Sequence, residues 1–192
     1  MNRNRVYWGL VATLLVSAAL FARGAVARKV ALNKPTVTVE TGSIVRLEKP
    51  IDGDTLLVRI GEDTVTLRIV GIKGFNPDLT RDPFAVWGKE AMTAINRLAE
   101  QKPLRVLANV PAKDKSGRVL ATLYVDDEDL ALELVRLGVA LVYTAYPFPQ
   151  MQSYLRAQAT AKAERKGLWG DPGAVARADA LAREWREREE AP

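Results

Sequence analysis

Two β-branched runs joined by a tight turn constrain the fold of this chain most strongly. Residues 55–60 and 64–70 are rich in β-branched side chains, and Gly61-Glu62-Asp63 lies between them. Such a pair of runs around a glycine-containing turn predicts a β-hairpin. A sheet therefore begins here, in a chain whose 192 residues suit one domain with appendages.

The remaining pattern predicts a mainly β fold with packed helices. A second pair of strands is expected at residues 104–110 and 119–125, and residues 88–100 between the two pairs have the spacing of a helix. Residues 130–137 and 151–166 predict two further helices, each closed by a glycine. Five strands with one helix interposed and helices at the end match the small Greek-key barrel called the OB-fold.

The first 27 residues have the layout of a secretory signal. Arg3 and Arg5 precede an apolar run at residues 6–22, and small residues follow at a cleavage spacing. The alternative is an uncleaved anchor, because a run of 17 residues is near the lower limit for a spanning helix. We expect the domain to be extracytoplasmic, either secreted or tethered to the membrane only through this segment. Residues 28–42 are polar and patternless, which predicts a linker onto a domain at residues 43–170.

Composition limits the chemistry that the chain can perform. The formal net charge is +5, but residues 1–27 hold three arginines and no acidic residue, so bulk charge gives little indication of nucleic-acid binding. The chain has no cysteine, which excludes disulfides, thiolate catalysis and cysteine-bound zinc. It has no histidine either, so the usual base at neutral pH is absent. Any hydrolysis must rely on carboxylates, arginines and a hard cation.

Residues 52–55, Asp-Gly-Asp-Thr, place two carboxylates beside a glycine turn. Carboxylate oxygens are the hard ligands that calcium prefers. Arg68 on the next strand can hold a phosphate with two parallel N–H groups. Together these residues suggest metal-assisted work on phosphodiesters. The simpler interpretation is an ordinary turn, with Arg68 as a structural partner of Asp54 or Glu90.

Six short motifs follow one another along the chain: IDGDT at residues 51–55, LRIVGI at 67–72, GKEA at 88–91, DKSGR at 114–118, LVRLGVA at 134–140 and GLW at 167–169. Each motif alone is weak, but their shared order and spacing resemble the staphylococcal nuclease (thermonuclease) family over residues 43–170. The resemblance implies a staphylococcal-nuclease-like OB-fold, calcium-dependent endonuclease activity and single-stranded DNA or RNA as the substrate.

The same resemblance assigns roles to particular residues. Asp54 matches a calcium-binding aspartate, and Arg68 and Arg118 match two arginines that hold the phosphate. Asp114 and Lys115 match a charged loop beside the substrate. A cation and two guanidiniums would surround a phosphate whose negative charge grows in the transition state.

Two tyrosines are candidates for the nucleotide pocket. Tyr146 approximates a tyrosine that lines the pocket in the resembled family, and Tyr143 lies close by in the sequence. Both would equally suit partly buried core positions with a solvated hydroxyl. The sequence leaves the two interpretations even.

Two departures from the family pattern weaken the expectation of catalysis. Without a gap, Lys73 stands where the second calcium aspartate is expected, and Asn76 stands where the glutamate base is expected. A protonated lysine cannot ligate calcium, and an amide cannot take a proton from water. Lys73 would instead pair with Asp54 and offer its charge to a phosphate. With two residues inserted, Asp78 would become the base and Phe75 would face the metal.

The sequence thus predicts a nuclease-family protein with weakened or lost phosphodiester hydrolysis, and the alternative is a non-catalytic domain that binds nucleic acid or protein. Residues 171–192 form a charged tail that is predicted to be helical over 174–190. The simpler expectation for this tail is a solvated helix with charge pairs four apart, such as Arg186 with Glu190. The sharper one is a helix that binds a protein partner.

Overall fold

The computed structural model describes residues 38–79, 82 and 84–190. The predicted signal or anchor at residues 1–27 and most of the predicted linker at 28–42 lie outside the described residues. Val39, near the end of that linker, is buried in the hydrophobic core. Within the described ranges, no helix combines the length and apolar character needed to cross a membrane.

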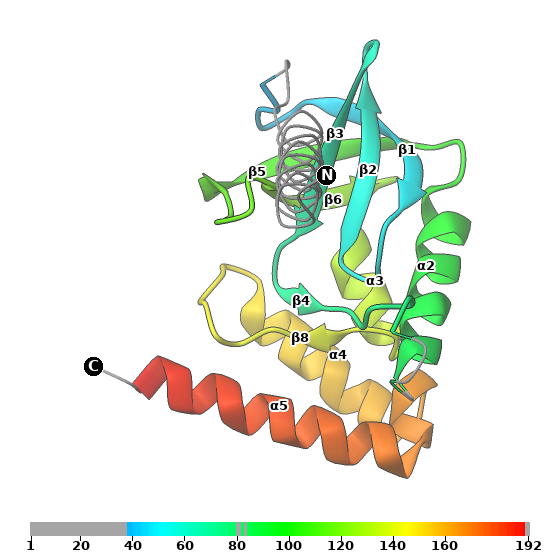
Figure 1. Cartoon of the computed structure of the whole chain (residues 1–192), viewed down its shortest axis with the longest axis vertical. Helices are drawn as coiled ribbons and strands as arrows, with labels where there is room; N and C mark the ends of the chain where they lie inside the picture. The colour runs from blue at the N-terminus through cyan, green and yellow to red at the C-terminus, as the bar shows by residue number, and fades with distance from the viewer. Residues whose placement is uncertain (1–37, 80–81, 83, 191–192) are drawn as a thin grey trace, which may run out of the picture. The chain divides into compact units, whose positions relative to one another are not determined.

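Five strands close into a barrel (Figure 1). Neighbours pair antiparallel in the order β3-β2-β1-β5-β6, and a parallel pairing of β3 with β6 closes the ring. This closed mixed barrel is the OB-fold that the sequence predicts. The strands are β1 (Ile44–Pro50), β2 (Thr55–Ile60), β3 (Asp63–Ile69), β5 (Pro103–Lys113) and β6 (Val119–Val125).

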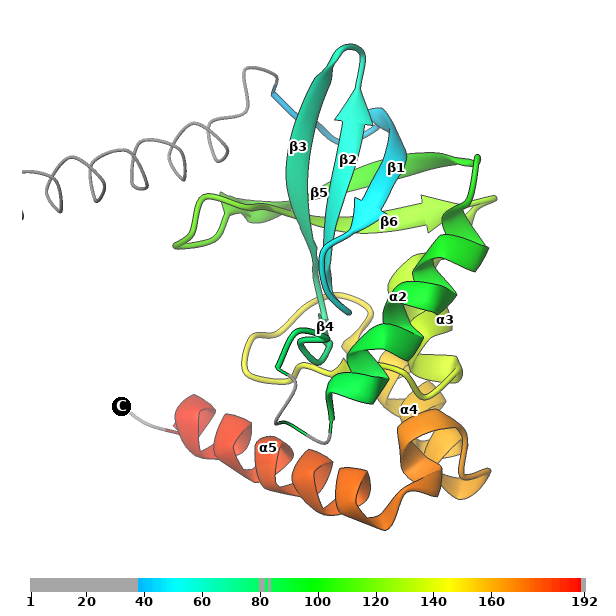
Figure 2. The same ribbon diagram turned by 45° about the vertical axis from the view of Figure 1, so that its right-hand side comes forward.

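Helices surround the lower part of the barrel. α2 packs against β1 and α3, and α3 packs against β6 and α4. The helices α4 and α5 lie below the end of the barrel (Figures 1 and 2). The four predicted helices are present, with ends that differ by up to a few residues. The helices are α2 (Ala85–Ala99), α3 (Leu130–Arg136), α4 (Met151–Ala163) and α5 (Pro172–Glu190), with a short 3-10 helix η1 (Gly167–Gly170) between the last two.

The sequence does not predict three strands of two residues each, because two residues are too few to show a periodicity. β4 (Ile72–Lys73) pairs antiparallel with β8 (Leu141–Val142), and β7 (Glu128–Asp129) extends the sheet beside β6. Ile72 and Val142 face each other in this small ladder and are both buried in the barrel core. The ladder therefore ties the chain after β3 to the chain before α4.

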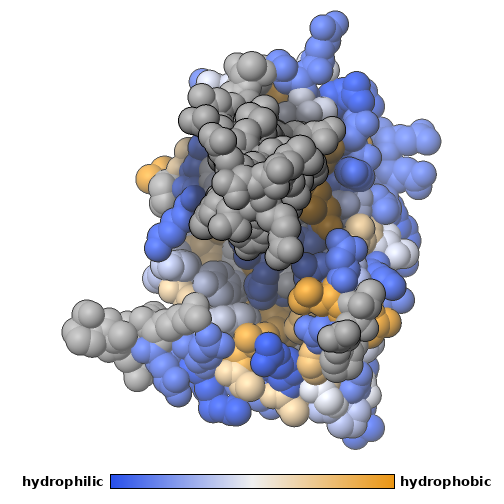
Figure 3. Space-filling model, viewed as in Figure 1, coloured by the Kyte–Doolittle hydropathy of each residue, from blue (hydrophilic) through white to orange (hydrophobic). Residues whose placement is uncertain are grey.

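A second hydrophobic core lies beneath the barrel and involves α5. Ala174, Ala178 and Trp185 of this helix are buried there together with Trp169. The expectation of a solvated terminal helix is therefore wrong for this face of α5, because the face packs against the domain. The side chain of Glu190, in the expected pair with Arg186, lies outside the described part. The visible surface is otherwise mainly hydrophilic, with hydrophobic residues showing in its lower half (Figure 3).

Two glycines of the sequence motifs make a direct backbone contact. Gly138 and Gly167 have φ values of 71° and 52°, in the region that favours glycine. A Cβ on Gly138 would lie 2.3 Å from the carbonyl oxygen of Lys166. The backbone N–H of Leu168 also donates to the Gly138 oxygen at 2.9 Å. These two motifs are therefore explained by close packing between the end of α3 and the start of η1.

Candidate functional site

Asp54 is the centre of a polar network just before β2, and only 1% of its surface is exposed. Arg68 contacts both carboxylate oxygens, with Nη1 3.0 Å from Oδ1 and Nη2 3.3 Å from Oδ2. Oδ2 also lies 3.2 Å from Lys73 Nζ and accepts the Gly74 N–H at 2.9 Å. The Thr55 hydroxyl donates to Oδ1 at 3.0 Å. The carboxylate is thus surrounded by donors, two of them cationic.

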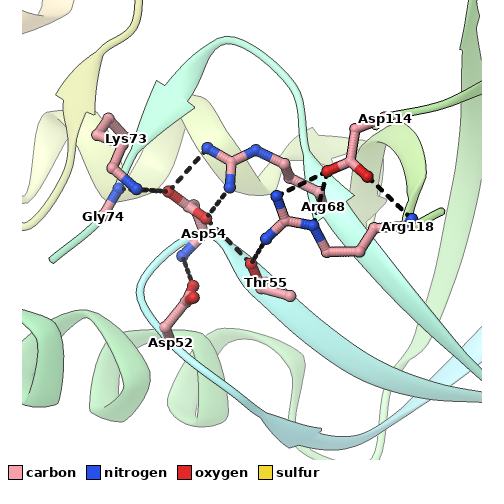
Figure 4. A network of polar contacts seen from close by, with 8 residues as sticks. All are labelled: Asp52, Asp54, Thr55, Arg68, Lys73, Gly74, Asp114 and Arg118. Atoms are coloured by element: carbon pink, nitrogen blue, oxygen red, sulfur yellow. Dashed lines mark hydrogen bonds and ion pairs between the residues drawn. The ribbon is translucent and has the colours of Figure 1, made fainter. Parts of the chain in front are cut away.

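Strand pairing brings the two candidate arginines to the same end of the barrel. Arg68 on β3 lies opposite Thr55 on β2 and beside Leu120 on β6. Arg118 directly precedes β6, so the parallel pair that closes the barrel carries both guanidiniums. Figure 4 shows them between the carboxylates of Asp54 and Asp114.

Asp114 holds Arg118 in place. Its Oδ2 lies 2.7 Å from Arg118 Nε and 2.6 Å from Nη2. Its Oδ1 accepts the backbone N–H groups of Ser116 and Arg118 at 2.8 and 3.0 Å, which fixes the turn. Lys115, at the tip of this turn, is exposed. The structure therefore brings Asp114 into the network through Arg118, whereas Lys115 extends into solvent.

Thr55 joins the two halves of the network and was not among the sequence candidates. Its hydroxyl donates to Asp54 and lies 3.4 Å from Arg118 Nη1. Its place in the Asp-Gly-Asp-Thr motif, next to the candidate metal ligand, was the signal that could have identified it. Asp52 belongs to the same motif, and its Oδ1 accepts the Asp54 backbone N–H at 2.8 Å.

The pKa values of the three carboxylates are shifted in different directions. Burial raises the pKa of Asp54, but the charges of Lys73 and Arg68 outweigh burial and hold that pKa below its ordinary value. Burial likewise opposes the hydrogen bonds and charge of Arg118, which lower the pKa of Asp114. For Asp52, burial and then the neighbouring Asp54 charge raise the pKa. Asp54 is therefore the stable anion at the centre of the site.

The loop after β3 places Lys73 beside Asp54, as the ungapped comparison with the family expects. The backbones touch here, since a Cβ on Gly74 would lie 2.4 Å from the carbonyl carbon of Gly53. Phe75 is buried and stacks on Phe84 at 5.5 Å between ring centroids. The ring belongs to the second hydrophobic core.

The residues at the two positions considered for a base, Asn76 and Asp78, lie further along the same loop. Asn76 and Asp78 are both exposed, and Asn76 Oδ1 accepts the Asp78 backbone N–H at 2.9 Å. The Asn76 side chain therefore stabilises a local turn. Neither residue is among those that contact Asp54 in the described network.

The residues around Asp54 do not fit a calcium ion. Calcium takes six to eight oxygen ligands, usually with several carboxylates. The groups that face the Asp54 oxygens are instead the guanidinium of Arg68, the ammonium of Lys73 and the N–H of Gly74, together with the Thr55 hydroxyl, and all four donate to Asp54. Within the described residues, no group of three or more acidic side chains converges to hold a metal.

The candidate tyrosines differ in exposure. Tyr146 is 69% exposed, whereas Tyr143 is half-buried against the second hydrophobic core. Their ring centroids lie 5.9 Å apart. The backbone N–H of Tyr143 donates to the Gly71 oxygen at 2.9 Å, which continues the β4–β8 pairing at the end away from Lys73. The pair thus stands beside the strand that carries Lys73.

Comparisons with known proteins show to which family the chain belongs. Residues 66–171, more than half of the chain, match the family described as "Staphylococcal nuclease homologue". An "Uncharacterized endonuclease" of Haemophilus influenzae is 29% identical over 75% of this chain and 73% of its own length. An "Uncharacterized endonuclease" of Escherichia coli is 30% identical, and a "Thermonuclease" of Staphylococcus intermedius is 26% identical, each over 70% of this chain and 80% of its own length. Barrel, motifs and relatives together show that the chain belongs to the staphylococcal nuclease family.

Proposed function

We propose that this domain binds the phosphodiester backbone of a nucleic-acid strand through Arg68, Arg118 and Lys73 without calcium, and that its hydrolytic activity is weak or lost. Membership of a nuclease family and relatives named as endonucleases support the nucleic-acid part. The observation that carries the rest is the distance of 3.2 Å between Lys73 Nζ and Asp54 Oδ2. An ammonium group fills the position at which the family resemblance expects a second calcium-binding carboxylate.

The arginines retain the capacity to hold an anion. A guanidinium has five N–H groups, and Arg68 directs two of them at Asp54. Arg118 uses its Nε and Nη2 groups on Asp114 and one Nη1 group on Thr55. Both side chains are partly exposed, at 18% and 27%, and Lys73 is 41% exposed. A strand that approaches from solvent would meet the three cations together.

Hydrolysis requires more than charge. A bound calcium ion would supply a Lewis acid for the phosphate, and an ammonium cannot coordinate oxygen ligands in this way. Asn76 cannot serve as a base, because a neutral amide does not take a proton from water. The arrangement therefore favours binding of the phosphodiester over its cleavage.

The test compares binding and cleavage of single-stranded DNA by the purified protein, in calcium and in chelator. We expect equal affinity in both conditions and little cleavage in either. A nucleoside bisphosphate should raise the melting temperature, since a ligand at about 100 times its Kd stabilises the folded state by about 2.7 kcal/mol. Arg68→Ala and Arg118→Ala should each remove most of that rise. Arg59→Ala, at an exposed arginine paired with Glu48, is the matched control and should leave the rise intact.

Two results would contradict the proposal. An unchanged melting shift in both arginine variants would mean that Arg68 and Arg118 are only structural. Strong calcium-dependent cleavage that Asp78→Asn abolishes would show that Asp78 is the base and that Lys73 is incidental.

A further inference from the structure

Three aromatic side chains form a continuous ladder from the second core to the surface. The Trp185 ring on α5 is buried and meets the Tyr143 ring edge to face, at 4.9 Å and 85°. Tyr143 in turn contacts Tyr146, whose ring is 69% exposed. We call Trp185, Tyr143 and Tyr146 the aromatic ladder. Its outer ring is an exposed aromatic with a supported position, which is what a stacking surface needs.

The aromatic ladder stands on the same face of the β4–β8 pair as Lys73. Lys73 lies opposite Leu141, and residues that oppose each other in an antiparallel pair point to the same side. Tyr143 is two residues beyond Leu141, so its side chain returns to that side. Leu141 and Tyr143 both pack in the second core, in agreement with this assignment. A nucleic-acid strand bound at Lys73 would therefore pass close to the aromatic ladder.

The helix that supplies Trp185 is anchored at several points. Ala174 and Ala178 are buried against the domain, and Asp179 lies 3.0 Å from Lys162 of α4. In both views α5 runs beneath the β4–β8 pair and the loop that follows β8 (Figures 1 and 2). The helix α5 is thus held in place beneath Tyr143.

We infer that Trp185 is a positioning residue, through which α5 holds Tyr143 and Tyr146 as a stacking platform for a base of the bound strand. This inference rests on the proposed function, since it assumes that the phosphate of that strand lies at Arg68, Arg118 and Lys73. Stacking on an aromatic ring is tolerant of base identity, because every base has a π-face. A ring that is already fixed loses less freedom when a base arrives, so burial of Trp185 strengthens binding without direct contact.

The experiment separates base contacts from phosphate contacts. Affinities of the full chain are measured for a short oligothymidylate and for an abasic strand with the same number of phosphates. Trp185→Leu keeps an apolar side chain but removes the ring, and Trp185→Phe restores a ring. Leu181→Ala is the control for helix packing, because Leu181 is half-buried on the same helix but has no aromatic ring.

We expect Trp185→Leu to weaken oligothymidylate binding at least about fivefold, the loss of one moderate stacking contact, while abasic-strand binding is unchanged. Trp185→Phe should bind like wild type, and Leu181→Ala should show no base-specific loss. Tyr146→Ala should match Trp185→Leu, and the double variant should lose little more, because both remove one platform. Equal losses on both strands, or no loss on either, would overturn the inference.

Arg68→Ala distinguishes failure of this inference from failure of the proposed function. The variant should weaken both strands, because the phosphates are common to them. If it weakens both while Trp185→Leu changes neither, the platform is refuted and the phosphate site stands. If Arg68→Ala changes neither strand, the phosphate site fails and the inference falls with it.

Discussion

Replacing Asp54 with asparagine separates a calcium site from an anion site held by side chains alone. Asp54 accepts from Arg68, Lys73, Gly74 and Thr55, and an asparagine side chain at this position would present N–H groups to two cations. Removing one partner of a fully buried ion pair costs about 3–5 kcal/mol. Arg68 and Lys73 are 18% and 41% exposed, so water can solvate the charges that are left. We therefore expect Asp54→Asn to lower the free energy of unfolding by about 1–3 kcal/mol.

The same substitution should strengthen anion binding. A phosphate on the far side of the Arg68 guanidinium would lie about 8 Å from the Asp54 carboxylate, by ordinary bond lengths and hydrogen-bond distances. At an effective dielectric constant of about 20 to 40, the repulsion between the two unit charges is about 1–2 kcal/mol. Removing it predicts roughly 5- to 30-fold tighter binding of an oligonucleotide at low salt, with a smaller gain at high salt. If the site required calcium, the loss of this carboxylate would instead weaken calcium binding and the activity that depends on it.

The assay measures oligonucleotide affinity in chelator at two salt concentrations, together with urea unfolding of the same samples. Asp126→Asn is the matched control, because it removes one negative charge at the opposite end of β6, where Asp126 pairs with Lys102. The control should leave affinity nearly unchanged. A folded Asp54→Asn protein with weaker binding than wild type would refute the reasoning.

Three further predictions concern the Asp54 network and the buried Tyr154–Asp129 pair. Lys73→Asp combined with Asn76→Glu restores the carboxylates that the family pattern expects. Calorimetry of this double variant should detect calcium binding, and a cleavage assay should detect hydrolysis of single-stranded DNA. A folded double variant that does not bind calcium would count against the assignment of Lys73. Tyr154→Phe removes the hydroxyl that donates to buried Asp129 at 2.7 Å. It should lower the free energy of unfolding in urea by about 1–3 kcal/mol and leave oligonucleotide affinity unchanged. A comparable loss of oligonucleotide affinity would link this pair to the site. Folding lowers the pKa values of Asp54 and Asp114, so their contribution to stability is complete above the unfolded pKa of about 3.9 and is lost as pH falls through the folded pKa values. Asp54→Asn should therefore flatten the acid decline in the free energy of unfolding, although the raised pKa of Asp52 acts with the opposite sign.

The regular elements were predictable because their signals are local. The runs at residues 55–60 and 119–125 have the bounds of β2 and β6, and the turn residues between strands gave the hairpins. The contact between Lys73 and Asp54 required the family comparison, since the two residues are far apart in the sequence and β4 is too short for a pattern. Val175, Leu181 and Trp185 have the spacing of a partly amphipathic helix, but the packing of α5 was not predicted because its other buried positions are alanines, which give a weak hydrophobic stripe. Trp185 was the one strong signal, and its partner Tyr143 could not be identified without the fold.

The candidate site residues depend on the barrel to different degrees. Arg68 and Arg118 are fixed by the β3–β6 pairing that closes the barrel, and Asp54 and Asp114 pair with them. Lys73 ends the short strand β4 and is partly exposed, and Asn76 is exposed in the loop that follows. Lys73 is 41% exposed and lies outside both hydrophobic cores, so the packing of the barrel does not depend on its side chain. In the proposed function, the barrel therefore keeps its fold and its two paired guanidiniums while the Lys73 ammonium stands beside Asp54.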